Sequence, residues 1–154
     1  MSFVIKPYEL SDIVWVVETA SYRSIVEEAN RPDLVNIRRW YEIAQLIDSH
    51  GIGFIVWKDE ERVGMIGSLI FPNLFNPEIK TSTIVTWYVL PEYRKSRVSM
   101  MLFKAMEEES KLAADGMTFS LLSNNMIKER TLTKLGFELT ESAFTKRFGE
   151  LNGN

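Results

Sequence analysis

The sequence predicts one α/β (α+β) domain, with a mixed, mostly antiparallel sheet of six to seven strands and helices on both faces. Three observations lead to this prediction. The 154 residues suit a single domain spanning residues 1–154. A hydrophobic share of 45% supports a packed core. Strand-like and helix-like segments alternate along the chain, which places one parallel strand-helix-strand unit at the centre of the sheet.

The first part of the chain is predicted to hold a short strand and two helices. The strand covers Phe3–Lys6 and ends at Pro7, which has no N–H to give to a sheet. Two apolar stripes with helical spacing follow, from Ile13 to Tyr22 and from Leu34 to Ile47. The polar segment between them, Arg23 to Pro32, fits either a loop or a frayed helix.

The second part of the chain is predicted to be richer in strands. Its β-branched and aromatic runs indicate strands, and its one long stripe with i, i+3, i+4 spacing indicates a helix. In order, the elements are a hairpin of Phe54–Trp57 and Val63–Phe71, a strand at Thr81–Leu90, a helix from Val98 to Ala113 stopped by Gly116, a strand at Met117–Leu122, a helix at Ile127–Leu135, and a terminal strand pair at Phe137–Leu139 and Ala143–Phe148.

Composition argues against several classes of function. Cysteine is absent and His50 is the only histidine, so we expect neither a metal site nor a histidine-based triad. The net charge of -3 opposes nucleic-acid binding, which needs a basic face. The longest apolar run, Val63–Phe71, is too short to cross a membrane, and no signal-peptide pattern is visible. We therefore expect a cytoplasmic protein with no membrane partner.

A basic turn between a strand and a long helix is the segment best suited to chemistry. The strand ends in Val89-Leu90-Pro91, and Arg94, Lys95 and Arg97 lie where the next helix begins. Unpaired backbone N–H groups and the helix dipole favour an anion at such a position. A basic turn that is merely solvated would look the same in sequence, so position alone leaves both interpretations open.

The residues around this turn resemble a known family. The run from Trp87 to Arg94, Trp-Tyr-Val-Leu-Pro-Glu-Tyr-Arg, followed by an amphipathic helix, resembles the acyl-coenzyme A motif of Gcn5-related N-acetyltransferases (GNAT). In the family's loop pattern, Gln/Arg-x-x-Gly-x-Gly/Ala, the first glycine falls on Arg97 and the second small residue on Ser99. The loop is therefore similar to an Arg-x-Ser-Arg variant of bacterial and phage members. Val63-Gly64-Met65-Ile66-Gly67 and Leu135-Gly136-Phe137 extend the resemblance.

The resemblance implies a GNAT-like acyl-coenzyme A N-acyltransferase domain that moves acetyl from acetyl-coenzyme A to a primary amine of a small molecule or protein. The strand ending at Val89 and its parallel neighbour near Phe119 would splay apart, with pantetheine between them. The implied cofactor-binding residues are Tyr88, Val89, Leu90, Arg94, Lys95, Ser96, Arg97, Val98, Ser99 and Asn125. Asn125 could equally cap the helix that follows it. Assembly into a homodimer is left open.

The catalytic residues follow less directly from the resemblance. Family members often protonate the leaving thiolate with a tyrosine, and that position is Leu132 here. Tyr88 is the candidate substitute, and the alternative is an aromatic residue packed in the core. Arg97 in place of glycine could bind phosphate through its guanidinium. The second hypothesis for function is a catalytically degenerate GNAT-fold binding or structural module, which the residues at 97 and 132 favour.

The acceptor side is less well marked. Glu27, Glu28 and Asp33 could attract a cationic amine, although solvated acidic side chains are common.

Overall fold

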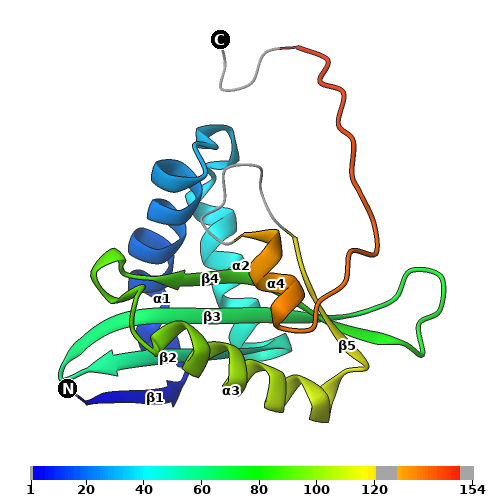
Figure 1. The fold of residues 1–154 in the computed structure, drawn as a ribbon. Helices are drawn as coiled ribbons and strands as arrows, with labels where there is room; N and C mark the ends of the chain where they lie inside the picture. Colours follow the sequence, from blue (N-terminus) through cyan, green and yellow to red (C-terminus); the bar gives the residue numbers. More distant parts are fainter. Residues whose placement is uncertain (1, 121–127, 150–154) are drawn as a thin grey trace.

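The computed structural model describes residues 2–120 and 128–149, and its centre is one mixed sheet (Figure 1). The order of the strands in the sheet is β1-β2-β3-β4-β5. Their bounds are β1 Phe3–Pro7, β2 Gly51–Lys58, β3 Glu61–Pro72, β4 Lys80–Val89 and β5 Gly116–Phe119. The first three pairings are antiparallel and the last, between β4 and β5, is parallel. The mixed, mostly antiparallel character predicted from the sequence is confirmed.

The helices lie on both faces of this sheet, as predicted. In Figure 1 α1 and α2 cover one face and α3 covers the other. The helical elements are η1 Leu10–Asp12, α1 Ile13–Trp15, η2 Val16–Ser21, η3 Arg23–Glu28, η4 Pro32–Leu34, α2 Ile37–His50, η5 Pro91–Tyr93, α3 Val98–Ala113 and α4 Glu129–Lys134. Both η2 and η3 are π-helical. The polar segment that could have been loop or helix is thus helical as far as Glu28.

Each face of the sheet has its own apolar core, because successive strand residues point to opposite faces. Ile55 of β2 is fully buried and packs with Ile47 of α2. The next residue, Val56, is also fully buried and packs with Leu102 of α3. Tyr8, which follows β1, connects this strand to α2, because its hydroxyl donates to the Ala44 carbonyl at 2.9 Å. Burial raises the pKa of the same hydroxyl to about 12.

The predicted terminal strand pair is wrong for the part of the chain that the structure describes. Neither Phe137–Leu139 nor Ala143–Phe148 forms a strand there, so the sheet has five strands and not six to seven. A strand requires a neighbouring edge for its backbone N–H and C=O groups. The segment instead runs outside the sheet, separated from β5 (Figure 1). As a result the parallel β4-α3-β5 unit, predicted at the centre, lies at one end of the described sheet.

Several boundaries also differ from those predicted. Gly116 begins β5 and does not terminate α3, which ends at Ala113 because Ala114 is already extended. The predicted strand Met117–Leu122 and helix Ile127–Leu135 correspond to β5 and α4, while residues 121–127 lie outside the described part. No helix within residues 2–120 or 128–149 has both the length and the apolarity needed to cross a bilayer.

Three buried serines connect α3 to the sheet. The Ser110 hydroxyl of α3 donates to Ser82 Oγ of β4 at 2.9 Å, and Ser82 donates to Ser68 Oγ of β3 at 2.8 Å. All three side chains are at most 3% exposed. Buried hydroxyls are tolerated when each has a hydrogen-bond partner, and each of these three serine hydroxyls has one. It therefore fixes the distance between α3 and the two central strands.

We expect Ser82→Ala to lower the free energy of unfolding by about 1–3 kcal/mol, because it leaves Ser110 without its oxygen acceptor and Ser68 without its donor. Urea denaturation measures the change. Ser2→Ala is the control, because Ser2 is exposed and its loss should cost less than about 0.5 kcal/mol. Equal stabilities of the two variants would show that the hydroxyl chain contributes nothing.

Candidate functional site

The two parallel strands part before β4 ends. Their last paired residues are Ile84 and Phe119, whereas β4 continues to Val89. The Leu90 N–H donates to the Val63 carbonyl at 2.9 Å, so it faces β3. Since backbone groups alternate in direction along a strand, those of Trp87 and Val89 face the other side. In the described part of the chain, this stretch of β4 therefore has no strand paired to its outer edge.

The turn after β4 presents unpaired backbone amides. In the described part of the chain, no hydrogen bond is seen for the amides of Arg97, Ser99 and Met100, and the first helical bond runs from Met101 N–H to the Arg97 carbonyl at 3.0 Å. The first amides of any helix lack partners within that helix. Here they point out of a 16-residue helix whose dipole is positive at this end. Such a group of donors can bind a phosphate.

The turn takes this shape without glycine. Arg94 has φ -69° and Arg97 has φ -79°, both in the region that any residue adopts. Ser96 shapes the turn locally, because its hydroxyl donates to the Tyr93 carbonyl and accepts from the Val98 N–H at 3.3 Å. Arginine at position 97 therefore leaves the backbone free to form this turn.

Arg94 holds the turn against the end of β4 and the N-terminal helices. Its Nε donates to the Val89 carbonyl at 2.9 Å, and its Nη2 forms an ion pair with Glu28 of η3. The guanidinium also lies 5.4 Å from the centre of the Tyr88 ring. Both partners of the ion pair are largely shielded, with side chains 27% and 22% exposed. Arg94 is thus engaged by the protein itself.

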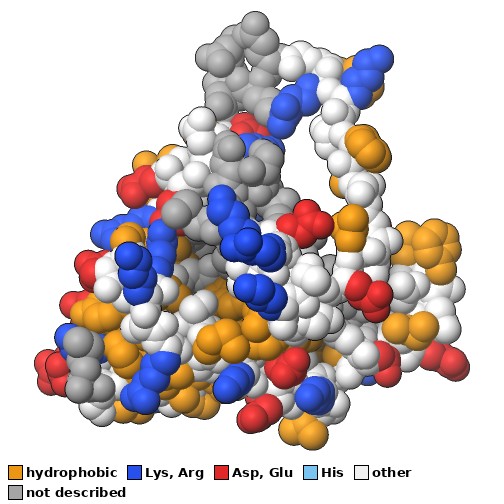
Figure 2. Space-filling model, viewed as in Figure 1, with side chains coloured by type: hydrophobic (Ala, Val, Ile, Leu, Met, Phe, Trp, Pro, Cys, Tyr) orange, Lys and Arg blue, Asp and Glu red, His pale blue; other side chains and the backbone are white. Residues whose placement is uncertain are grey.

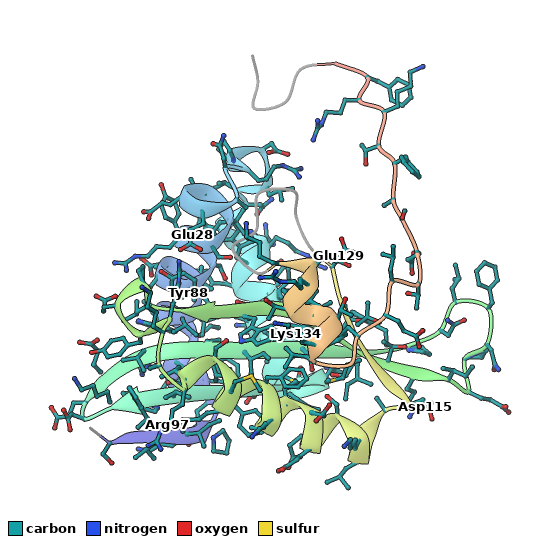
Figure 3. All side chains as sticks on the ribbon, viewed as in Figure 1. Glu28, Tyr88, Arg97, Asp115, Glu129 and Lys134 are labelled. Atoms are coloured by element: carbon teal, nitrogen blue, oxygen red, sulfur yellow. The ribbon has the colours of Figure 1, made fainter. Side chains whose placement is uncertain are left out.

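Arg97 and Lys95 are differently placed. The Arg97 guanidinium lies 5.8 Å from the Phe3 ring of β1, and Figure 3 shows it beside that strand, away from Tyr88 and Glu28. Lys95 is exposed. The contribution of residue 97 to an anion site at the helix start therefore comes from its amide, while its side chain adds positive charge from the direction of β1.

Tyr88 and Trp87 carry buried polar atoms with no partner in the described structure. The Tyr88 hydroxyl and the Trp87 Nε1 lack any hydrogen bond, although Tyr88 is only 3% exposed. Arg23 of η3 approaches the hydroxyl without reaching hydrogen-bond geometry, and Tyr88 is the main cause that raises the pKa of this guanidinium. Buried polar groups without partners are rare, and a bound water, a bound ion or a catalytic role commonly explains them.

The other predicted site residues divide into two groups. Val89, Leu90 and Val98 are buried at 6%, 8% and 0% exposure, so they can offer a ligand only their backbone groups. Asn125 lies outside the described residues. Leu132, at the position of the family's tyrosine, is 7% exposed within α4.

Positive charge is also present on α4. Figure 2 shows Lys and Arg side chains gathered over this helix, which carries exposed Lys128, Arg130 and Lys134 at or next to it. Cations therefore lie on both the α3 side and the α4 side of the open strand edge.

A separate hollow of about 360 Å³ is lined by Lys58, Asp59, Glu60, Glu61 and Tyr93, and its three carboxylates would repel a phosphate.

Sequence reasoning missed two members of the site. Arg23 was assigned only to a polar segment, and Glu28 was considered only as a charge that could attract an amine. Nothing in the spacing of Glu28 and Arg94, 66 positions apart, signals that they pair. The one signal available was chemical: an acid-rich segment and a basic turn in the same small domain.

A family model matches residues 13–137, which is most of the chain, and its description is acetyltransferase (GNAT) family. The chain belongs to this GNAT family. No curated protein sequence matches it. The match covers both the N-terminal helices and the β4-α3-β5 unit, so it includes every element of the site.

Solved structures of other acetyltransferases have the same fold. A predicted acetyltransferase from Clostridium acetobutylicum, crystallised with acetyl-CoA, is 13% identical with a TM-score of 0.77, over 95% of this chain and 96% of that one. AAC(6')-Iy, in complex with the bisubstrate analogue CoA-S-monomethyl-acetylneamine, is 18% identical with a TM-score of 0.72, over 97% and 99%. An acetyltransferase from Trypanosoma brucei is 17% identical with a TM-score of 0.66, over 96% and 100%. At these identities the likeness shows the fold.

We expect Arg94 and Glu28 to be coupled by at least about 1 kcal/mol in a double-mutant cycle of Arg94→Ala and Glu28→Ala, because the pair is mostly shielded from water. Urea denaturation of the four proteins gives the coupling. Arg38 and Glu42 form the control pair: their side chains are 92% and 45% exposed and their coupling should be about 0.3–0.5 kcal/mol. A coupling no larger than that of the control pair would show that the Arg94–Glu28 ion pair adds no stability beyond that of an exposed pair.

Proposed function

We propose that this GNAT-family chain is an acetyl-coenzyme A-dependent N-acetyltransferase that acetylates a primary amine of a small molecule or protein. One observation carries the proposal: unpaired amides at the start of α3 adjoin an open edge of β4. The two features suit different parts of one elongated ligand. A diphosphate needs a cluster of donors, and an amide-containing arm needs a free strand edge.

The diphosphate would bind at the start of α3. The amides of Arg97, Ser99 and Met100 provide donors, and the helix dipole adds favourable potential. Lys95 and the α4 cations Arg130 and Lys134 would raise the local concentration of an anionic ligand without needing a fixed contact. The Arg-x-Ser-Arg loop would thus bind phosphate by backbone, with Ser96 maintaining the turn.

The pantetheine arm would lie along β4 beyond the last β4-β5 pair. The backbone groups of Trp87 and Val89 face this gap, and the Val89 carbonyl already accepts from Arg94. The Val89 N–H and the Trp87 groups are therefore the ones left to pair with ligand amides. Addition of an extended ligand to a free strand edge satisfies those groups in the same way as another strand would.

In the reaction the amine nitrogen attacks the thioester carbonyl carbon, the new C–N bond replaces the C–S bond, and coenzyme A leaves as a thiolate that takes up a proton. The Tyr88 hydroxyl is our candidate donor of that proton. It is buried, free of a hydrogen bond in the described structure, and near the guanidinium of Arg23, while the Arg94 guanidinium lies over the Tyr88 ring. Water would remove the proton that the amine loses.

The acceptor would approach from the side of the N-terminal helices. In the complex of AAC(6')-Iy, the bound analogue joins coenzyme A to an acetylated neamine, which is consistent with an amine acceptor in this fold. In our chain Glu28 pairs with Arg94 and Asp33 pairs with Arg31. A cationic acceptor would have to compete with these arginines for Glu28 and Asp33. Glu27 is exposed and forms no ion pair in the described structure, so it could bind such an acceptor directly.

Coenzyme A should raise the melting temperature of the protein, because a ligand that binds only the folded state stabilises it.

Ser99→Asp should weaken coenzyme A binding by at least about tenfold, since a carboxylate at the helix start takes the place of the diphosphate, yet it should not lower the stability of the free protein. Isothermal titration measures affinity. Ser99→Asn, which has the same shape without the charge, is the matched control.

Absence of any melting shift at saturating coenzyme A would refute the proposal. Binding without turnover over a broad panel of amines would instead support the degenerate binding module.

Tyr88→Phe should lower kcat by about 10²-fold or more, if the hydroxyl protonates the leaving thiolate, with little change in KM for acetyl-coenzyme A. Because this hydroxyl makes no hydrogen bond in the described structure, its loss should not reduce stability. Steady-state kinetics and urea denaturation of the same samples test both halves. Tyr93→Phe is the control, since Tyr93 lies on the outer side of the turn against Phe3. An unchanged kcat in Tyr88→Phe would make Tyr88 a core aromatic residue.

A further inference from the structure

Arg23 is a cation of the site that has no carboxylate partner in the described structure. It begins η3, and its side chain is exposed. Two arginines near it differ in this respect, because Arg94 pairs with Glu28 and Arg31 pairs with Asp33. A guanidinium presents a planar set of N–H donors that matches a carboxylate or phosphate. Arg23 can therefore offer this set of donors to a ligand.

Arg23 lies beside the buried end of Tyr88. Ala20, three positions before Arg23 and so on the same side of the helix, is fully buried in the apolar cluster that also holds Tyr88. Interaction with the Tyr88 hydroxyl is the main cause that raises the pKa of Arg23, and the charges of Glu27 and Glu92 add to it. Neither glutamate forms an ion pair with it in the described structure. The guanidinium is thus held near the hydroxyl by no carboxylate.

This position is close to the reacting atoms, given the acetyltransferase function proposed above, on which this inference rests. If the Tyr88 hydroxyl protonates the leaving thiolate, the sulfur must come within about 3 Å of that hydroxyl. The attacking nitrogen must approach the carbonyl carbon bonded to that sulfur to about 3–3.5 Å. Arg23 therefore lies only a few bond lengths from the nitrogen of the acceptor.

A cation at this place restricts which acceptors fit. It disfavours the ammonium form of the amine, and the neutral form is the one that attacks. It attracts an acceptor that carries an anionic group next to its amine. In an α-amino acid one carbon atom bears both the amine and the carboxylate, so the two groups can reach the thioester and Arg23 together. A polyamine or a lysine side chain has no anion at this distance.

We propose that the acceptor of this chain is a free α-amino acid, whose carboxylate binds Arg23 while its α-amine faces the thioester. Arg23 and the carboxylate form charge-assisted hydrogen bonds, which are stronger than neutral ones. The α-nitrogen forms a bond to the acetyl carbon as the C–S bond breaks. The thiolate takes its proton from Tyr88, which regains one from solvent, and water takes the proton that the amine loses. The carboxylate changes no bond, so Arg23 determines specificity.

Kinetics with matched acceptors test this proposal. The standard amino acids that have a primary amine are each compared with the amine that lacks the carboxylate but keeps the same side chain, using acetyl-coenzyme A and the full-length protein. At least one amino acid should have a kcat/KM about tenfold or more above that of its matched amine, because hydrogen bonds to charged groups contribute a factor of this size. Release of free thiol gives the rate, and mass spectrometry identifies the N-acetylated product.

Variants of Arg23 assign the preference to this side chain. Arg23→Gln should lower kcat/KM for the amino acid at least about tenfold more than for its matched amine. The intrinsic reactivity of each acceptor is the same with both proteins, so it cancels in this ratio. Arg23→Lys should retain part of the preference, because it keeps the charge but loses the planar set of donors. Arg38→Gln, at a side chain 92% exposed on α2, is the matched control and should retain all of it.

Three outcomes would overturn the proposal, and they differ in what else they affect. Matched amines that react as well as the amino acids would exclude the carboxylate while leaving the acetyltransferase function intact. An equal loss for both acceptors in Arg23→Gln would show that Arg23 acts only through Tyr88 or the thioester. If no amine of either kind reacts and coenzyme A does not raise the melting temperature, the acetyltransferase function fails and this proposal fails with it.

Discussion

The early end of pairing between β4 and β5 is the constraint on which the rest of this structure depends. Among the residues that the structure describes, β4 and β5 form no pair beyond Ile84 and Phe119, so no described strand lies beside the backbone of β4 from Trp87 to Val89 on that side. A buried strand edge without partners costs free energy. The fold can tolerate it because the same strand is held firmly on its other side by β3 and because its faces are packed against helices. The open edge is where we propose that the pantetheine arm binds.

The turn that follows β4 depends on this edge as well. Arg94 reaches back to the Val89 carbonyl and across to Glu28, so one side chain connects the end of the strand, the turn and the N-terminal helices. Ser96 shapes the turn from within. These local interactions position the first amides of α3, and they do so without a glycine. Arg97 therefore affects which side chains surround the proposed anion site more than it affects the backbone that would bind the anion.

The N-terminal helices contribute to the site through unusual geometry. Both η2 and η3 are π-helical, and π-helical turns are rare and often occur at functional sites. Here η3 delivers Arg23 to the Tyr88 hydroxyl and Glu28 to Arg94. The N-terminal helices and the end of β4 are thus connected by polar contacts.

Much of the framework was determined by sequence alone. The alternation of β-branched runs and helical stripes predicted β1 to β5, α2 and α3 within a few residues, and the order of short motifs around Trp87 to Ser99 pointed to the GNAT family. These features are local, since each depends on neighbours a few positions apart. The terminal strand pair failed for the opposite reason. Residues Ala143–Phe148 have the pattern of a strand, but a strand exists only when another edge accepts it, and that depends on where the segment lies.

Only the tertiary structure decided how the site is assembled. It brought Glu28 to Arg94 across 66 positions, turned the Arg97 guanidinium toward Phe3, and left the Tyr88 hydroxyl buried without a hydrogen bond in the described structure. Sequence spacing cannot specify such contacts, because they depend on how distant elements pack together. The chain's local pattern determined that a basic turn and a helix start would follow β4, and packing determined which side chains lie beside them.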